Sequence, residues 1–137
     1  MKHEKLRNLE RNASGTDPMA SNGRPRKVRG LSGVCGFSTT VAAHSDDMQM
    51  VSLKIVSDCE KIRGLAGALD CPIDAYQEIG NGSDGTVLKA ARNHLSGCCA
   101  GCVVPSGIFK SVQVAGGVAL PAPISITIER AQEDGQQ

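Results

Sequence analysis

Residues 36–56 read GFSTTVAAHSDDMQMVSLKIV. Two runs within this stretch alternate between residues that suit a buried face and smaller or polar residues. The residues that suit a buried face are Phe37, Thr39, Val41 and Ala43 in the first run and Val51, Leu53 and Ile55 in the second. A period of two is typical of strands with one buried face, and the polar residues between the two runs favour a turn. We therefore predict an antiparallel hairpin made of residues 36–44 and 49–56.

Downstream of the hairpin, apolar residues recur at helical spacing in three runs, over residues 57–69, 86–95 and 105–119. A spacing of three or four residues places side chains on one face of a helix, so each run predicts a helix with a buried face. The stretch between the first two runs, residues 71–85, keeps neither period. We predict that it is irregular.

A final alternating run closes the pattern, because Ile124, Ile126 and Ile128 are separated by polar residues. This run predicts a third strand. The predicted order of elements is β-β-α-α-α-β. We therefore predict an α+β fold, a two-layer sandwich in which the antiparallel hairpin and the C-terminal strand pack against about three helices.

The formal charge of +1 is spread unevenly along the 137 residues. Residues 1–30 carry eight Lys or Arg and three Asp or Glu, whereas the rest of the chain carries seven and eleven. Residues 1–30 also have few apolar side chains, which predicts a disordered basic tail before a domain of residues 31–130 and a frayed end, 131–137. The tail has no aromatic residue to stack on bases, so we expect it to be solvated and predict no nucleic-acid partner.

The sequence contains no run of about 18 apolar residues, and its basic start is not followed by an apolar signal core. We therefore expect no membrane contact and a cytoplasmic location. Thiols stay reduced in the cytoplasm. The six cysteines of this chain then indicate metal or redox chemistry rather than disulfide bonds.

Residues 97–107 read GCCAGCVVPSG and contain three of the six cysteines, Cys98, Cys99 and Cys102. A hydrophobic core does not require three thiols within five positions. The C-x-x-C spacing of Cys99 and Cys102 lets both sulfurs reach one metal ion, and Gly101 keeps the turn free of a bulky side chain. Because adjacent side chains diverge, either Cys98 stands outside the site or the centre contains several irons.

Two further cysteines lie at the ends of the predicted hairpin, Cys35 before it and Cys59 after it. Antiparallel pairing brings the ends of a hairpin together, so these two thiols are expected to be close in space. We place Cys59 in the first turn of the helix 57–69, capped by Ser57 or Asp58. Backbone N–H groups at that position favour a negatively charged thiolate.

Together these residues supply the four thiolates that a tetrahedral zinc ion or a [4Fe–4S] cluster requires. The predicted cofactor-binding set is Cys35, Cys59, Cys99 and Cys102, with Cys98 as an alternative metal ligand. The sequence does not separate an iron–sulfur cluster from zinc.

The remaining candidate ligands lack partners at ligand spacing. We predict that Cys71 is a buried small residue, that His94 lies on the wetter side of its helix, and that His44 is solvated at a turn. Nucleophile-elbow, phosphate-loop and H-E-x-x-H motifs are absent from the sequence. No catalytic residue is therefore predicted, and the sequence leaves open whether the chain is an enzyme.

The sequence C-G-F at residues 35–37, followed by a hairpin, Cys59 at a helix start and a later cysteine, resembles the N-terminal scaffold domain of the NifU/SufU (IscU-like) iron–sulfur assembly proteins. Phe37 stands where those proteins carry Asp. The resemblance implies that a nascent cluster or zinc is held by Cys35, Cys59 and one of Cys98, Cys99 and Cys102.

A longer pattern, CGF…SDC…CCxxCxVP over about residues 34–128, resembles a small uncharacterised family of cysteine-containing proteins from anaerobic prokaryotes. This resemblance implies a cysteine site and an anaerobic setting, without an assigned activity.

Three functions are compatible with these residues. The leading hypothesis is a metal- or iron–sulfur-binding protein with a carrier, assembly or sensing role, whose partners are proteins that exchange metal or clusters. The second is a thiol–disulfide redox protein that uses Cys99 and Cys102. The third is an interaction module with a structural zinc. The sequence does not give the oligomeric state.

Overall fold

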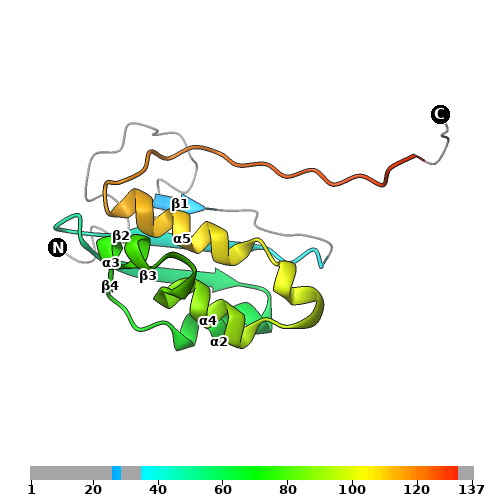
Figure 1. Ribbon diagram of the computed structural model, residues 1–137, viewed down its shortest axis with the longest axis horizontal. Helices are drawn as coiled ribbons and strands as arrows, with labels where there is room; N and C mark the ends of the chain where they lie inside the picture. The colour runs from blue at the N-terminus through cyan, green and yellow to red at the C-terminus, as the bar shows by residue number, and fades with distance from the viewer. Residues whose placement is uncertain (1–25, 29–34, 133–137) are drawn as a thin grey trace.

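The computed structural model describes residues 26–28 and 35–132. These residues form an antiparallel sheet with the strand order β1-β2-β3-β4, covered on one face by helices (Figure 1). The strands are β1 (Arg26–Val28), β2 (Thr39–His44), β3 (Met50–Ser57) and β4 (Ile73–Asp74). The α-helices are α2 (Glu60–Ala68), α3 (Ala75–Asn81), α4 (Thr86–His94) and α5 (Val104–Ala115), and two 3₁₀ helices are η1 (Gly82–Asp84) and η2 (Gly97–Gly101). The predicted α+β class is confirmed.

The predicted hairpin is present as β2 and β3, which pair from Thr39 opposite Ser57 to His44 opposite Ser52. Val41, Ala43 and Val51 are fully buried on the side that faces the helices. The alternation in the sequence therefore identified the core face of the hairpin within β2 and β3. The prediction is wrong for Phe37, which precedes β2 and is 44% exposed.

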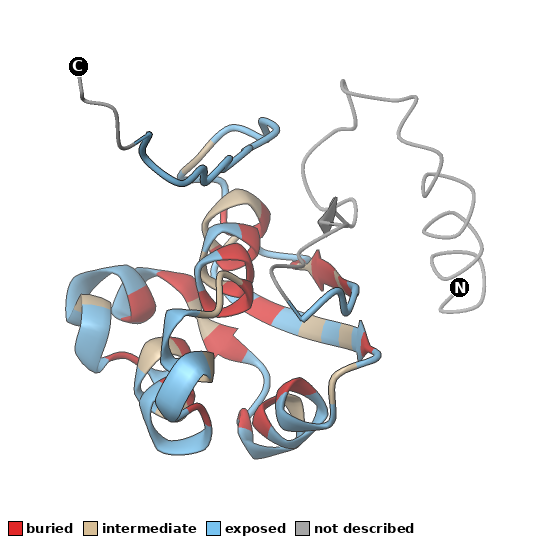
Figure 2. Cartoon of the chain, turned by 90° about the vertical axis from the view of Figure 1, so that its right-hand side faces the viewer, coloured by how far each residue is buried: buried red, intermediate tan, exposed pale blue. Residues whose placement is uncertain are grey.

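The helices bury the stripes that their sequence spacing predicts. Ile62 and Leu65 of α2 are buried, and α2 packs on β3. The helix α5 buries Ile108 and Val112 and packs on β1, β2 and β3, while α4 lies against both α2 and α5. Figure 2 shows the buried residues on the inward faces of these elements. One core therefore joins the sheet to three helices.

The predicted C-terminal strand is not part of this sheet, and that prediction is wrong. Residues 120–132 belong to no helix or strand and run as an extended segment (Figure 1), and Ile124, Ile126 and Ile128 are 63%, 64% and 88% exposed. A strand needs a partner backbone as well as an alternating sequence. In the described sheet the outer positions are taken by β1 and β4.

Two helix predictions also need correction. The stretch predicted as irregular contains β4 and α3, and the side chain of Asp74 accepts hydrogen bonds from the amides of Tyr76 and Gln77 in the first turn of α3. The last predicted helix ends at Ala115 rather than at residue 119, because Gly117 adopts a φ of 78°. Short elements such as α3 leave too few residues for a period to be recognised.

The strand β1 lies inside the segment 1–30, so the prediction of a disordered tail is wrong for residues 26–28. The other residues of that segment, and residues 133–137 of the predicted frayed end, lie outside the described residues. The sheet therefore begins earlier than the predicted domain start at residue 31.

The stretch Gly97–Ala115 is long and apolar enough, by composition, to meet the requirement for a membrane span. In this fold its larger part is α5, which buries Val104, Ile108 and Val112 against the other elements. Its apolar residues therefore have a role as a core helix. The cytoplasmic location stays a prediction.

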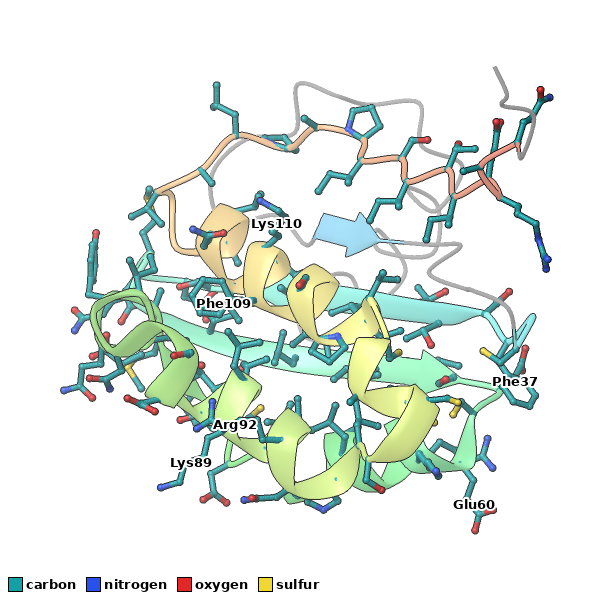
Figure 3. The ribbon with its side chains drawn as sticks, turned by 45° about the vertical axis from the view of Figure 1, so that its right-hand side comes forward. Phe37, Glu60, Lys89, Arg92, Phe109 and Lys110 are labelled. Carbon is teal, nitrogen blue, oxygen red and sulfur yellow. The ribbon has the colours of Figure 1, made fainter. Side chains whose placement is uncertain are left out.

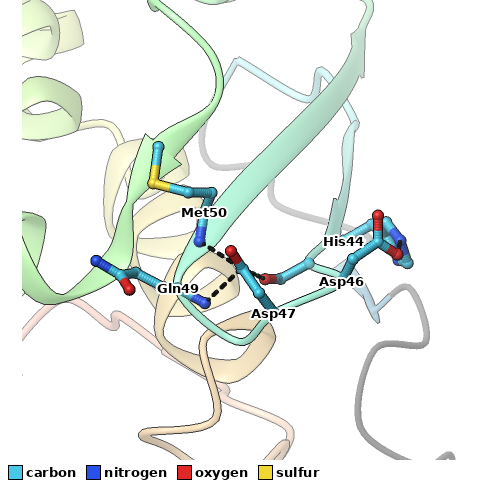
Figure 4. Close-up of polar contacts among 6 residues, drawn as sticks. His44, Asp46, Asp47, Gln49 and Met50 are labelled. Atoms are coloured by element: carbon cyan, nitrogen blue, oxygen red, sulfur yellow. Dashed lines mark hydrogen bonds and ion pairs between the residues drawn. The ribbon is translucent and has the colours of Figure 1, made fainter.

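The exposed aspartate Asp47 organises the end of the hairpin where β2 turns into β3 (Figure 4). Oδ1 of Asp47 accepts hydrogen bonds from the backbone amides of Met50 and Gln49, which lower the pKa of Asp47 below its ordinary value. The side-chain amide of Gln49 donates to Asp74, the cap of α3, and is the main cause of the lowered pKa of Asp74. Gln49 therefore links the turn to α3.

These pKa shifts predict acid sensitivity. A carboxyl group whose folded pKa lies below its unfolded pKa stabilises the fold above the unfolded pKa, and this stability is lost as pH falls through the folded value. We expect the free energy of unfolding to fall as pH drops below about 4, and to fall less steeply in Asp47→Asn and Asp74→Asn. Urea unfolding across that pH range measures the slope. Asp70→Asn removes an exposed carboxylate and is the control, so an equal slope in all variants would contradict this assignment.

Candidate functional site

The end of the hairpin opposite this turn fixes the backbone at Cys59. The hydroxyls of Thr39 and Ser57 are hydrogen bonded at 2.8 Å and are buried. Oγ of Ser57 also accepts from the amide of Cys59 at 3.0 Å, and the amide of Asp58 donates to the carbonyl oxygen of Ser38 at 3.1 Å. Hydrogen bonds from both strands therefore fix the backbone at Asp58 and Cys59, immediately before α2.

Cys59 is the N-cap residue of α2 rather than a residue of its first turn. The prediction of Ser57 or Asp58 as the cap is wrong, because these residues continue the contacts between the strands. The side chain of Cys59 makes no capping hydrogen bond to the backbone amides of α2. The side chain of Cys59 is half-buried and packs against the core.

The C-x-x-C sequence forms the 3₁₀ helix η2 and its C-terminal cap. The amide of Cys102 donates to the carbonyl oxygen of Cys99 at 3.1 Å, and the amide of Cys99 donates to Ser96 in the same way. Side chains three residues apart lie on one side of such a helix. Cys99 and Cys102 are both half-buried and pack against the core, whereas Cys98 is exposed. Of the two adjacent cysteines, Cys99 therefore faces the same way as Cys102.

A lysine joins the beginning of α2 to η2. Nζ of Lys61 donates to Sγ of Cys99 at 3.5 Å, across 38 residues of sequence. Lys61 is two residues after Cys59, so the contact brings the start of α2 against the C-x-x-C turn. The contact therefore places a basic side chain beside one of the predicted ligand sulfurs.

Cys35 is exposed and precedes β2. Figure 3 shows its near neighbour Phe37 at the same end of the molecule as Glu60, next to the turn that leads into α5. The segments that carry the predicted set meet at this end, because Ser38, three residues after Cys35, contacts Asp58, and Lys61 contacts Cys99. Within the described residues, however, no three Cys, His, Asp or Glu side chains form a group ready to hold a metal ion.

The other thiol and the histidines stand apart from this end. Cys71 is exposed, so the prediction that it is buried is wrong, and it follows the far end of α2 from Cys59. A ring nitrogen of His94 lies 3.0 Å from the carbonyl oxygen of Ala90, on an exposed side of α4. His44 is half-buried rather than solvated as predicted, and pairs with Asp46 at the opposite end of the hairpin.

Sequence reasoning missed Lys61 and the hydroxyl of Ser57. Both act through contacts between segments that are distant in sequence, 38 residues apart for Lys61 and Cys99 and 18 for Ser57 and Thr39. The position of Lys61 two residues after a predicted ligand was the only local signal.

The comparisons with known proteins place this chain in one family. No curated protein and no solved structure matches it, so none of them supports the resemblance to the NifU/SufU scaffold domain. Residues 27–128 match a family of unknown function (DUF6951), a range that begins within β1 and includes all six cysteines. Since this match covers well over half of the chain, the chain belongs to the family DUF6951.

Proposed function

We propose that this chain binds a soft metal, as zinc or as an iron–sulfur cluster, through Cys59, Cys99 and Cys102, with Cys35 as the fourth thiolate. The observation that carries the proposal is the contact between Lys61 and Cys99. It ties the helix start that holds Cys59 to the C-x-x-C turn. Thiolates are the ligands that both zinc and iron–sulfur clusters accept.

The exposure of the thiols favours a site that loads and releases its metal. Three of the sulfurs lie half-buried at the rim of the core and Cys35 is exposed, so a metal ion or a partner protein has access to them. No ligand group is assembled beforehand among the described residues, so binding has to draw the thiols together. This behaviour suits a carrier, assembly or sensing protein that exchanges metal or clusters with partner proteins.

A purely structural zinc has less support. The buried core of this fold is built from aliphatic side chains of the sheet and of α2, α4 and α5. Small domains that need zinc to fold lack such a core. The core here does not depend on the cysteines. We therefore propose the metal as cargo or cofactor rather than as an ion that the fold needs for stability.

A second candidate function rests on the common direction of Cys99 and Cys102. In thiol–disulfide exchange, the thiolate of one cysteine attacks a substrate disulfide and releases the first substrate thiol. The other cysteine then attacks the mixed disulfide and releases the second. The substrate disulfide is reduced to two thiols while the Cys99–Cys102 pair is oxidised to a disulfide.

Metal analysis separates these functions. The chain purified without oxygen is expected to contain either zinc or about four irons with matching sulfide. Replacing any of Cys59, Cys99 and Cys102 by Ser is expected to weaken metal binding by about 100-fold or more, because the ligand set becomes incomplete. Competition with a coloured chelator measures the affinity.

The chain offers two matched controls for that experiment. Cys71→Ser and Cys98→Ser remove exposed thiols outside the proposed set and are expected to leave the affinity unchanged. A metal-free chain in which Cys99 and Cys102 cycle reversibly between dithiol and disulfide contradicts metal binding and supports the second candidate.

A further inference from the structure

The end of the described chain is apolar, extended and unsupported. Residues 119–132 make no hydrogen bond to any described residue. Figures 1 and 2 both show this segment apart from the sheet and the helices. Within it, Leu120 is 89% exposed and the isoleucines Ile124, Ile126 and Ile128 are 63–88% exposed. An isolated extended segment with this much apolar surface requires a partner.

The run from Ile124 to Ile128 has the pattern of a strand rather than of a linker. Its three isoleucines alternate with Ser125 and Thr127, and β-branched residues at both parities favour an extended backbone. In an extended chain the isoleucines share one side. The segment 124–128, named here the C-terminal strand segment, therefore offers an apolar face together with free backbone donors and acceptors.

The same chain also has a sheet edge to which such a segment could add as a further strand. In the described sheet β1 is an outer strand, paired on one side with β2 and lacking a strand on the other. A free sheet edge is a template for another strand. The family match begins within β1 and ends at Ile128, so the acceptor edge and the C-terminal strand segment both belong to the family domain.

We propose that the C-terminal strand segment adds to the outer edge of β1 in a second copy of this chain, by reciprocal exchange in a two-fold dimer. Figure 1 shows the segment and β1 running in the same direction within one copy. A two-fold axis perpendicular to the strands reverses the direction of every strand in the partner subunit relative to the first. The exchanged segment then runs antiparallel to the partner subunit's β1, which continues the antiparallel pattern of the sheet.

A second copy is the occupant that these observations favour, because each chain supplies both the segment and the edge. Reciprocal exchange satisfies both at once and closes the assembly at two subunits. Residues 116–123, between α5 and the segment, can span about 25 Å when extended, enough to cross from one subunit to the other. The proposal does not depend on the cysteine site.

The test uses the full chain and two single variants. Sedimentation is expected to show a dimer for the wild type and at least about a tenfold weaker dimer for Ile126→Asp, whose charge falls on the apolar face of the segment and opposes strand addition. Leu120→Asp removes an equally exposed apolar side chain outside the alternating run and is expected to keep the dimer. Neither residue belongs to the described core, so both variants should fold.

Mixed dimers of differently isotope-labelled chains then locate the contact. Magnetisation transfer between residues 124–128 of one subunit and residues 26–28 of the other is expected. A monomeric wild type, a dimer that Ile126→Asp leaves unchanged, equal loss of the dimer in both variants, or transfer only within one subunit would each overturn the proposal. Cys99→Ser is expected to leave the dimer intact, which keeps this test separate from metal binding.

Discussion

Replacing Glu78 by alanine is expected to lower the free energy of unfolding by about 3 kcal/mol. Glu78 is 3% exposed, and its two carboxylate oxygens accept hydrogen bonds from the backbone amides of Thr86, at 2.9 Å, and Val87, at 2.6 Å. These amides begin α4, whose N-cap residue is Gly85 and has no side chain to serve them. The variant leaves both donors without their acceptor, and urea unfolding measures the loss.

A double-mutant cycle with Gly85→Ala separates this role from general packing. A Cβ atom at position 85 would lie 2.8 Å from Oε2 of Glu78, closer than real contacts allow. Gly85→Ala is therefore expected to destabilise the wild type clearly and the Glu78→Ala variant much less, since the clash is then absent. Additive losses would show that the carboxylate does not occupy this position.

Replacing Ile108 by alanine is expected to cost about 2–5 kcal/mol of stability, through lost burial and the cavity that remains. Ile108 is fully buried in α5, the helix that packs on three strands of the sheet and on α4. Lys110 is exposed on the same helix, as Figure 3 shows, so Lys110→Ala is the control and is expected to change stability by less than about 0.5 kcal/mol. Chemical unfolding of both variants compares the two sites. Equal losses would contradict the assignment of α5 as the central core helix.

Much of the fold could be predicted because its information is local. The period of two from Thr39 to Ala43, and again from Val51 to Ile55, states which face of each strand is buried. The helical period does the same for α2, α4 and α5. These patterns follow from the geometry of a single element, and they identified the buried faces without knowledge of any neighbour.

The misses arose where structure depends on a distant partner. The isoleucines of the C-terminal strand segment have a strand pattern, but no described strand pairs with them. Glu78 acts as a cap for amides eight and nine residues away, and its sequence neighbours give no sign of this. A pattern can state the preference of a segment, but only the three-dimensional structure supplies its partner.

In the candidate site, too, the local features could be predicted from the sequence and the contacts between distant segments could not. The pairing of β2 with β3 brought the hairpin ends together as predicted, and the C-x-x-C spacing formed a tight turn with Cys99 and Cys102 on one side. The sequence could not choose between Cys98 and Cys99, because that choice depends on how η2 rests on the core. It also could not locate Lys61, whose contact crosses from α2 to η2.

The central claim is that thiols from α2 and η2 act as one metal-binding unit, and zinc protection of individual cysteines tests it most directly. The full chain is treated with an alkylating reagent with and without zinc, and modification is followed at each cysteine by mass spectrometry. We predict that zinc slows the alkylation of Cys59, Cys99, Cys102 and Cys35, whereas Cys71 and Cys98 react at the same rate in both samples. Equal rates with and without zinc at all six cysteines, or protection confined to Cys71 and Cys98, would contradict the account.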